Sequence, residues 1–347
     1  MPSLAVKYRP QNFESVLSQE YTIRILKHQL ETNTFKNAYL FCGPSGDGKT
    51  TLARIFSSCI NNGKGSPIEV DGASNNGVDN VRSLIFEASS RSLDSEYKTI
   101  IVDEAHMLTT AAWNAFLKCL EEPPKYTIFI FCTTDPQKIP ATIMNRLMKF
   151  TLTRVPFEQV RDRLIYISKC EGFLNCEDAC DYIAKLANGG VRDAISMLEK
   201  CASFSVDLSM NNVIKVLGNV SYDAMFDVTN AIIDGDRRSV IATMERLHMD
   251  GIETKTFVDQ YIGFLLDLNK YCLFGDISYT KLPTTVLNPK HENDSRCVKY
   301  ATGIENPCKV FSSLVTKVND IKYKMKNDSN QHMTATIEIA SLCDTQL

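Results

Sequence analysis

The segment CGPSGDGKTT, residues 42–51, constrains this chain more than any other, because it has the spacing G-x-x-x-x-G-K-[ST]. It follows the apolar run AYLFC (38–42) and opens a segment of helical character, KTTLARIFSSC (49–59). Glycines in such a loop let backbone N–H groups surround a phosphate, and the following helix adds the dipole of its N-terminus. The order strand, glycine-rich loop, helix predicts a polyphosphate-binding loop; the alternative is a glycine-rich turn without a ligand.

Within this loop, Lys49 is expected to reach the β- and γ-phosphates, and the Thr50 hydroxyl to hold Mg²⁺. Asp47 is unusual there, because a carboxylate repels phosphate. Since backbone donors bind the phosphate, we expect Asp47 to face solvent or a neighbouring subunit, where salt screens its charge. The whole nucleotide-binding loop comprises Gly43, Pro44, Ser45, Gly46, Asp47, Gly48, Lys49, Thr50 and Thr51.

A second part of the site is predicted at IIVDEAH, residues 100–106. Asp103 follows three apolar residues, so it would lie at the end of a buried strand, where it could hold Mg²⁺ through water. Glu104 beside it could orient and deprotonate an attacking water molecule. Taken alone, Asp-Glu at a strand end could be a solvated turn. After a phosphate loop, two carboxylates with separate tasks favour hydrolysis over nucleotide storage.

Short apolar runs predict an α/β fold. They alternate with segments of helical spacing, such as 111–122, where Trp113, Phe116, Leu117 and Leu120 fall at i, i+3, i+4 and i+7. This alternation is typical of a parallel sheet covered on both faces. Beyond residue 153 the pattern predicts helices only, with a long loop at 280–297. The five predicted strands are 38–42, 67–72, 98–104, 127–134 and 149–153.

Composition excludes few functions. Lys and Arg total 38 against 41 Asp and Glu, so any contact with nucleic acid requires a local basic patch. The N-terminus lacks the apolar core of a signal peptide, and the apolar runs are too short to cross a bilayer.

The twelve cysteines contain no CxxC pair; Cys176 and Cys180, one helical turn apart, are expected to be free core thiols rather than metal ligands. A reducing cytoplasm fits this pattern.

Six separated blocks, in this order, resemble the ATPase subunits of sliding-clamp loaders within the AAA+ class, in the form of the bacterial DNA polymerase III gamma/tau subunits. The resemblance covers about residues 4–270. The blocks are KYRPQNFESVLSQE (7–20), the phosphate loop, EVDGASNNGVDNVR (69–82), IIVDEAHMLTTAAWNAFLKCLEEPP (100–124), FCTTDPQKIPATIMNRL (131–147) and GGVRDAISMLEK (189–200).

The resemblance implies an AAA+ nucleotide-binding core over 1–153, a helical lid over 154–207 and an all-helical collar for oligomerisation over 208–347. It implies a Mg²⁺-dependent ATPase that opens a sliding clamp and places it on primed-template DNA. The expected partners are the clamp, the DNA and other clamp-loader subunits in a pentameric ring or spiral, with no membrane contact. ATP and Mg²⁺ are the expected cofactors, and the location would be the bacterial or, for a phage-encoded form, the host cytosol.

The resemblance also implies roles for individual residues. Tyr8, Arg9 and Pro10 would lie against adenine, with Val16 and Leu17 helping to enclose it; an ordinary packing turn at the N-terminus is the alternative. Thr134 would be the polar sensor of the γ-phosphate, with Thr133 as the second choice. Arg192 would be the sensor arginine of the lid.

Arg146 matches the arginine that reaches the ATP site of a neighbouring subunit, where a guanidinium neutralises charge on the transferred phosphoryl group. The family pattern is Ser-Arg-Cys, whereas this chain has Asn145-Arg146-Leu147. Without the surrounding motif, a surface salt bridge would be the simpler reading of Arg146 or Arg192.

Asn75, Asn76 and Arg82 are the candidates for backbone contacts with DNA, although Asn75 or Asn76 could instead cap a helix. The resemblance places clamp contact around Met107–Thr110, where apolar residues could equally belong to the core. Gamma/tau subunits carry a four-cysteine zinc module after the phosphate loop. Here that interval holds only Cys59, so we predict no zinc.

Two rival functions remain. A structural clamp-loader subunit would bind nucleotide without hydrolysing it, which Lys49, Asp103 and Glu104 argue against. Another AAA+ DNA-remodelling ATPase, such as a branch-migration motor, would be expected to carry a winged helix, whereas residues 208–347 read as helical without a basic recognition helix.

Overall fold

A computed structural model describes residues 2–218, 220–276, 279–280, 282, 303–326 and 328–344. The chain divides into two compact units. Unit 1 comprises Met1–Ile167 and Ala187–Ser196, and unit 2 comprises Ser168–Leu186 and Met197–Leu347. The domain boundaries expected at 153 and 207 stay predictions.

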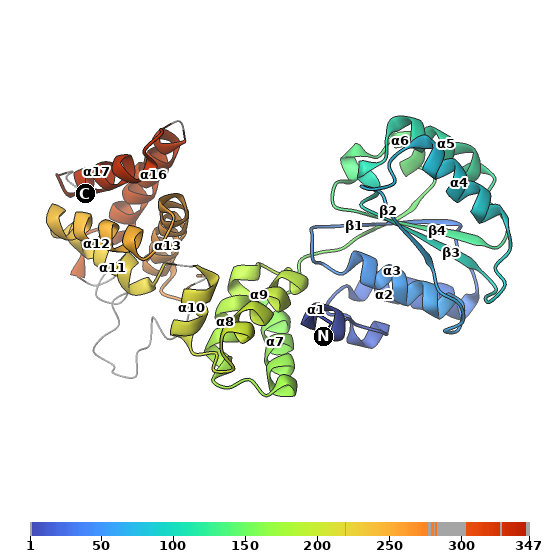
Figure 1. Cartoon of the computed structure of the whole chain (residues 1–347), viewed down its shortest axis with the longest axis horizontal. Helices are drawn as coiled ribbons and strands as arrows, with labels where there is room; N and C mark the ends of the chain where they lie inside the picture. Colours follow the sequence, from blue (N-terminus) through green and yellow to red (C-terminus); the bar gives the residue numbers. More distant parts are fainter. Residues whose placement is uncertain are drawn as a thin grey trace. The chain divides into compact units, whose positions relative to one another are not determined.

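Unit 1 is built on a parallel sheet (Figure 1). Its strands have the order β2-β3-β4-β1-β5. The prediction of five parallel strands is confirmed. The observed ends differ from the predicted ones by at most two residues. The strands are β1 (Ala38–Cys42), β2 (Ile68–Asp71), β3 (Lys98–Asp103), β4 (Thr127–Thr133) and β5 (Met148–Thr151).

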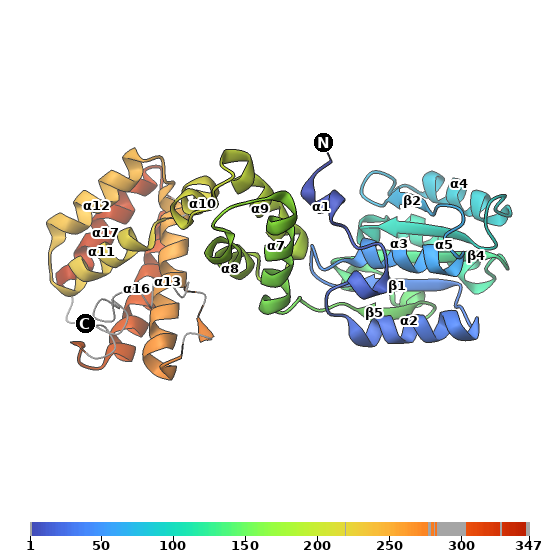
Figure 2. The same ribbon diagram turned by 90° about the horizontal axis from the view of Figure 1, so that it is seen from below.

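Helices cover both faces of this sheet, because side chains alternate across each strand. In β1, Tyr39 and Phe41 pack on one side, whereas Leu40 packs on the other. The first side is covered by α2 (Glu20–Thr32) and α3 (Lys49–Ile60), and the second by α4 (Val78–Ser89), α5 (Thr110–Glu121) and α6 (Ala141–Met144) (Figure 1). Figure 2 shows α2 beside β5, where Gln29 contacts the sulfur of Met148.

Short elements complete unit 1 around the ends of the strands. They are α1 (Leu4–Lys7), η1 (Phe13–Ser15), η2 (Ala105–Met107) and η3 (Pro136–Lys138). Two longer helices, α7 (Phe157–Glu171) and α9 (Val191–Phe204), lie in unit 1 as far as residue 167 and residue 196, respectively. The parts of these two helices that belong to unit 1 carry residues that line the site described below.

Unit 2 is helical, as the sequence predicts, apart from one isolated bridge between Leu174 and Asp207. Its core includes Phe226 of α11, Tyr261 of α13 and Phe311 of α16, all almost fully buried. The loop predicted at 280–297 lies largely outside the described residues. The helices are α8 (Cys176–Ala187), α10 (Met210–Leu217), α11 (Tyr222–Ile233), α12 (Arg237–Met249), α13 (Thr254–Phe274), α16 (Pro307–Met325) and α17 (Gln331–Ser341), followed by η5 (Leu342–Asp344).

The described cysteines are free thiols, and Cys176 and Cys180 are both buried on α8, which confirms their prediction as core thiols. Burial raises the pKa of the Cys180 thiol to about 12. Over the same described residues, no helix combines the length and the apolar character that crossing a membrane requires.

Candidate nucleotide site

The phosphate loop lies between β1 and α3, which confirms the predicted order of strand, loop and helix. Gly46 and Gly48 have φ values of 81° and 89°, a left-handed conformation that side-chain-bearing residues adopt only with strain. Gly48 is the N-cap of α3, so the free N–H groups at the start of this helix open onto the loop. The backbone therefore has the form that an anion-binding loop requires.

The Lys49 side chain is buried and curls back over the loop. Its Nζ donates hydrogen bonds of 2.9 Å to the carbonyl of Gly43 and 2.7 Å to that of Pro44. A buried ammonium needs such acceptors. These bonds hold the positive charge at the loop, within reach of a phosphate bound there.

Thr50 and Asp103 meet at the ends of α3 and β3. The Thr50 hydroxyl donates a 2.7 Å hydrogen bond to Oδ2 of Asp103. Hard oxygen donors suit Mg²⁺, which usually binds through one or two protein oxygens together with phosphate and water. Among the described residues, no group of three or more His, Cys, Asp or Glu side chains is placed to hold a metal. The oxygen pair fits a Mg²⁺ ion that takes its remaining ligands from nucleotide and water.

Glu104 follows Asp103 in a left-handed conformation, with φ of 44°, and its backbone N–H donates to Oδ1 of Asp103 at 3.0 Å. Its Oε2 accepts a 3.3 Å hydrogen bond from the Thr134 hydroxyl and lies 3.3 Å from Nδ1 of His106. The structure thus brings the predicted base and the predicted sensor into contact. His106, which sequence reasoning did not single out, also contacts the Thr133 hydroxyl at 3.1 Å.

A cavity of about 420 Å³ extends from the loop to the N-terminal segment. That volume lies within the usual range for small-molecule sites. It brings together most of the residues assigned to nucleotide binding, including the pair Asp103 and Glu104. The predicted residues that line it are Tyr8, Arg9, Pro10, Val16, Leu17, Ser45, Gly46, Asp47, Gly48, Lys49, Thr50, Thr51 and Arg192.

Two further arginines line this cavity, and neither was predicted. Arg163 of α7 donates a 2.7 Å hydrogen bond to the backbone carbonyl of Tyr8, which fixes the segment expected to contact adenine. Arg54 of α3 pairs with Glu69 of β2 at 2.5 Å. Arg54 lies one helical turn after Thr50, so helical spacing from the loop could have identified it. Arg163 has no local sequence signal.

The prediction for Asp47 is wrong. Its side chain has no exposed surface, and neither carboxylate oxygen has a hydrogen-bond partner. Burial raises the pKa of this carboxyl to about 6, while the nearby charges of Arg154 and Lys49 lower it and that of Asp193 raises it. The expectation of an outward side chain considered only the loop, whereas residues 154 and 193 close over it from distant parts of the sequence.

Arg146, in contrast, lies outside the set of described residues that line the cavity. It follows α6 and donates hydrogen bonds to the Thr142 carbonyl and to Oε1 of Glu121, at the end of α5. This position leaves the predicted action on a neighbouring subunit untested.

Of the predicted DNA-contact residues, Asn75 and Asn76 lie just before α4 and Arg82 lies within it. Asn75 donates to the carbonyl of Asp71 through both its backbone N–H and its side chain, and Arg82 pairs with Asp79 at 3.4 Å. The N-cap of α4 is Gly77, so the alternative role of Asn75 or Asn76 as helix cap is wrong.

In the predicted clamp-contact segment, Met107 is 45% exposed and Thr109 caps α5 by accepting from the Ala112 N–H. Met107 is therefore not part of the core, whereas Leu108 is buried in it, as the alternative expected. Contact with a clamp stays a prediction.

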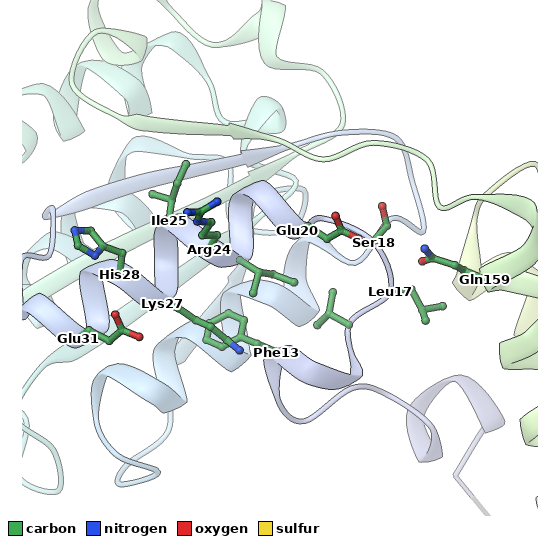
Figure 3. Close-up of a pocket in the computed structure, with 12 residues that line it drawn as sticks. Phe13, Leu17, Ser18, Glu20, Arg24, Ile25, Lys27, His28, Glu31 and Gln159 are labelled. Carbon is green, nitrogen blue, oxygen red and sulfur yellow. The ribbon is translucent and has the colours of Figure 1, made fainter.

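A second hollow, of about 950 Å³, lies along η1 and α2 (Figure 3). Val16 and Leu17 line both this hollow and the nucleotide cavity. Phe13 forms an apolar part of the wall, and Lys27 beside it pairs with Glu14 at 2.5 Å. No predicted site residue other than Val16 and Leu17 lines it.

Known proteins resemble this chain in sequence and in fold. A family model described as DNA polymerase III, delta subunit, matches residues 66–156. DNA polymerase III subunit tau of Bacillus subtilis is 35% identical over 76% of this chain and 51% of its own length. Subunit tau of Escherichia coli is 32% identical over 76% of this chain and 44% of its own.

Subunit gamma of Buchnera aphidicola is 30% identical over 76% of this chain and 78% of its own length. The chain spans about half the length of the Bacillus subtilis and Escherichia coli relatives. Among solved structures, the RuvB Holliday junction branch migration motor of Thermotoga maritima has a TM-score of 0.51 at 17% identity, covering 65% of this chain and 79% of the RuvB chain. That identity is low enough that the likeness shows the fold alone.

The parallel sheet, with a phosphate loop after β1, an Asp-Glu pair at the end of β3 and a helical remainder, gives the chain the P-loop fold of the AAA+ class. Within that class, the chain belongs to the DNA polymerase III gamma/tau subunit family.

Proposed function

We propose that this chain is a Mg²⁺-dependent, ATP-hydrolysing subunit of a DNA sliding-clamp loader. The observation that carries the proposal is the meeting of Thr50, Asp103 and Glu104 at the phosphate loop, with Thr134 in contact with Glu104. A site built only to store nucleotide has no need of a second, separately oriented carboxylate. Membership of the gamma/tau family supports the assignment to a clamp loader.

Each residue then has a distinct task. Lys49 neutralises the β- and γ-phosphates, and Thr50 with Asp103 would hold Mg²⁺, which supplies charge stabilisation of the transferred phosphoryl group. Glu104 accepts a proton from the attacking water, and Thr134 orients Glu104. Arg192 senses the γ-phosphate from α9. Tyr8, Arg9, Pro10, Val16 and Leu17 enclose adenine.

Arg146 acts on the ATP of a neighbouring subunit. Arg146 is not among the described residues that line its own cavity, and it contacts Glu121 instead, which supports a role outside its own site. A ring or spiral of clamp-loader subunits follows from such a role. The sliding clamp and primed-template DNA are the proposed partners, with Asn75, Asn76 and Arg82 as DNA contacts, and the site of action is the cytosol.

The first test measures steady-state ATP hydrolysis with and without primed-template DNA and a sliding clamp. We expect strong stimulation by DNA and clamp together, lost in Lys49→Ala and Arg146→Ala but kept in the exposed control Lys64→Ala. If a complex reconstituted with all partner subunits stays inert, the chain is a structural subunit and the proposal fails.

A mixing experiment tests the role of Arg146 separately. Each variant alone, Lys49→Ala or Arg146→Ala, has no complete site. In a mixture, some interfaces combine an intact phosphate loop with an intact arginine, so hydrolysis should partly return. If the mixture is as inactive as either variant, Arg146 does not act across the interface.

A further inference from the structure

The buried carboxylate of Asp47 has no role in the mechanism proposed above. It lies in the loop that receives the phosphates, its side chain has no exposed surface, and both its oxygens lack hydrogen-bond partners. A buried charge of this kind is costly unless an opposite charge compensates it. A carboxylate beside bound phosphate also repels it.

Arg154, just after β5, is the cation placed to compensate Asp47. Its Nη1 lies 4.0 Å from Oδ1 of Asp47, and its side chain is 46% exposed. Lys49, the other cation beside this carboxylate, donates to the carbonyls of Gly43 and Pro44. Arg154 is therefore the cation that does not already belong to the phosphate site.

The first turn of α9 lies against the same region around Asp47 and Arg154. A Cβ on Gly190 would lie 2.9 Å from Oδ2 of Asp193 and 3.4 Å from Nη1 of Arg154. A Cβ on Gly46 would lie 3.5 Å from the same Asp193 oxygen. The phosphate loop, the segment after β5 and the start of α9 thus meet around Gly190. Two carboxylates and one guanidinium gather there.

We propose that Arg154 is a positioning residue for nucleotide binding: it neutralises Asp47 and so keeps the phosphate loop able to accept a nucleoside polyphosphate. This inference rests on the proposed nucleotide binding. Without Arg154, the loop would keep an uncompensated carboxylate and the phosphate would bind against it. Without both residues, the repulsion and its compensation disappear together.

The test is a double-mutant cycle on the full chain, in which isothermal titration calorimetry measures the affinity for MgADP, which is not hydrolysed. We expect Arg154→Ala to weaken binding about tenfold, and the double variant Asp47→Asn/Arg154→Ala to return to within about threefold of the unmodified protein. Arg161→Ala is the matched control, because this arginine of α7 pairs with its neighbour Asp162. It should bind as the unmodified protein does.

A second readout separates charge compensation from a merely structural role of Arg154. The charged groups facing Asp47 are Arg154 after β5, Lys49 of α3 and Asp193 of α9. Burial raises the pKa of Asp47 to about 6 in the unmodified protein, where the charge of Arg154 lowers it. Removal of Arg154 therefore raises this pKa further, so Asp47 of the variant is protonated by about pH 6. MgADP affinity of Arg154→Ala should therefore recover between pH 8 and about pH 6, whereas the double variant should show no such recovery.

Two results would overturn the inference: unchanged binding in Arg154→Ala, or binding in the double variant as weak as in Arg154→Ala. Lys49→Ala keeps the failures distinguishable. Binding by the unmodified protein that is lost in Lys49→Ala establishes the nucleotide site whatever Arg154 does. Absence of binding by the unmodified protein overturns the inference and the proposed function together.

Discussion

The hydroxyl of Thr50, in the first turn of α3, lies 2.7 Å from Oδ2 of Asp103, at the end of β3. Thr50 follows β1 and Asp103 ends β3, and β4 lies between these two strands in the sheet. In a parallel sheet the carboxyl ends of the strands share one edge, which is where ligands bind. The hydrogen bond therefore shows that the two halves of the predicted site meet there.

Thr50→Ala should remove most of the gain in ADP affinity that Mg²⁺ provides, because the ion loses one of its two protein oxygens. We expect the ratio of affinities with and without Mg²⁺ to fall by about tenfold, measured by titration calorimetry. Thr50→Ser keeps the hydroxyl and should retain the ratio. An unchanged ratio in Thr50→Ala would remove this residue from the metal site.

Glu104→Gln should lower ATP hydrolysis by at least about 10²-fold and leave MgATP binding within a few-fold of normal, because the amide cannot accept the proton of water. Single-turnover hydrolysis and filter binding measure the two effects separately. Glu122→Gln, a change of the same kind at an exposed glutamate, is the control. Hydrolysis at the normal rate in Glu104→Gln would place the base elsewhere.

Asp47→Asn should stabilise unit 1 in a pH-dependent way. The pKa of Asp47 is raised by burial from 3.8 to about 6, so the folded state binds its proton more tightly than the unfolded state does. The contribution of this group to stability is thus largest at low pH and is lost as pH rises to about 6. The loss amounts to at most about 3 kcal/mol.

Thermal unfolding of the two proteins from pH 4 to pH 8 checks this sign. The difference in midpoint between Asp47→Asn and the unmodified protein should grow up to about pH 6 and then stay level. Asp94→Asn, at an exposed position, makes the same change in charge and should give a difference that lacks this rise. A difference that shrinks with rising pH would show that the carboxylate is stabilised, not destabilised, when ionised.

Phe116→Ala should destabilise unit 1 by about 3–5 kcal/mol, because it empties a fully buried position between the sheet and α5. Trp113 is the only tryptophan of the chain and lies with its ring centroid 5.9 Å from that of Phe116, in the same core. Its fluorescence therefore follows the unfolding of unit 1. Phe86→Ala, at a phenylalanine of α4 that is 84% exposed, should have little effect.

The strands and the phosphate loop could be predicted because their signals are local. Apolar runs such as TIFIFCTT indicate buried strands by their own composition, and the phosphate loop requires glycines at fixed spacing. Thr50, Asp103 and Glu104 were predicted for the same reason, since each sits where a strand or the loop ends. The contact of Thr134 with Glu104 is also consistent with the strand-end position predicted for both.

Features that depend on distant segments could not be predicted in this way. Asp47 is buried because Arg154 and Asp193, more than a hundred positions later, close over it. Arg163 reaches the Tyr8 carbonyl from α7, with no pattern in the sequence to mark the pair. Loop composition predicts which backbone conformation is allowed, but it does not predict which side chains of other elements will cover it.

The pairing of Arg146 with Glu121 has a consequence for assembly, under the proposed action of Arg146 on a neighbour. A guanidinium that already pairs with a carboxylate in the free subunit loses less side-chain entropy when it meets a phosphate across an interface than an unpaired one would. When that phosphate leaves, the Glu121 carboxylate can again accept hydrogen bonds from the Arg146 guanidinium. Subunits joined in this way can separate and reassociate repeatedly without leaving the Arg146 guanidinium unpaired.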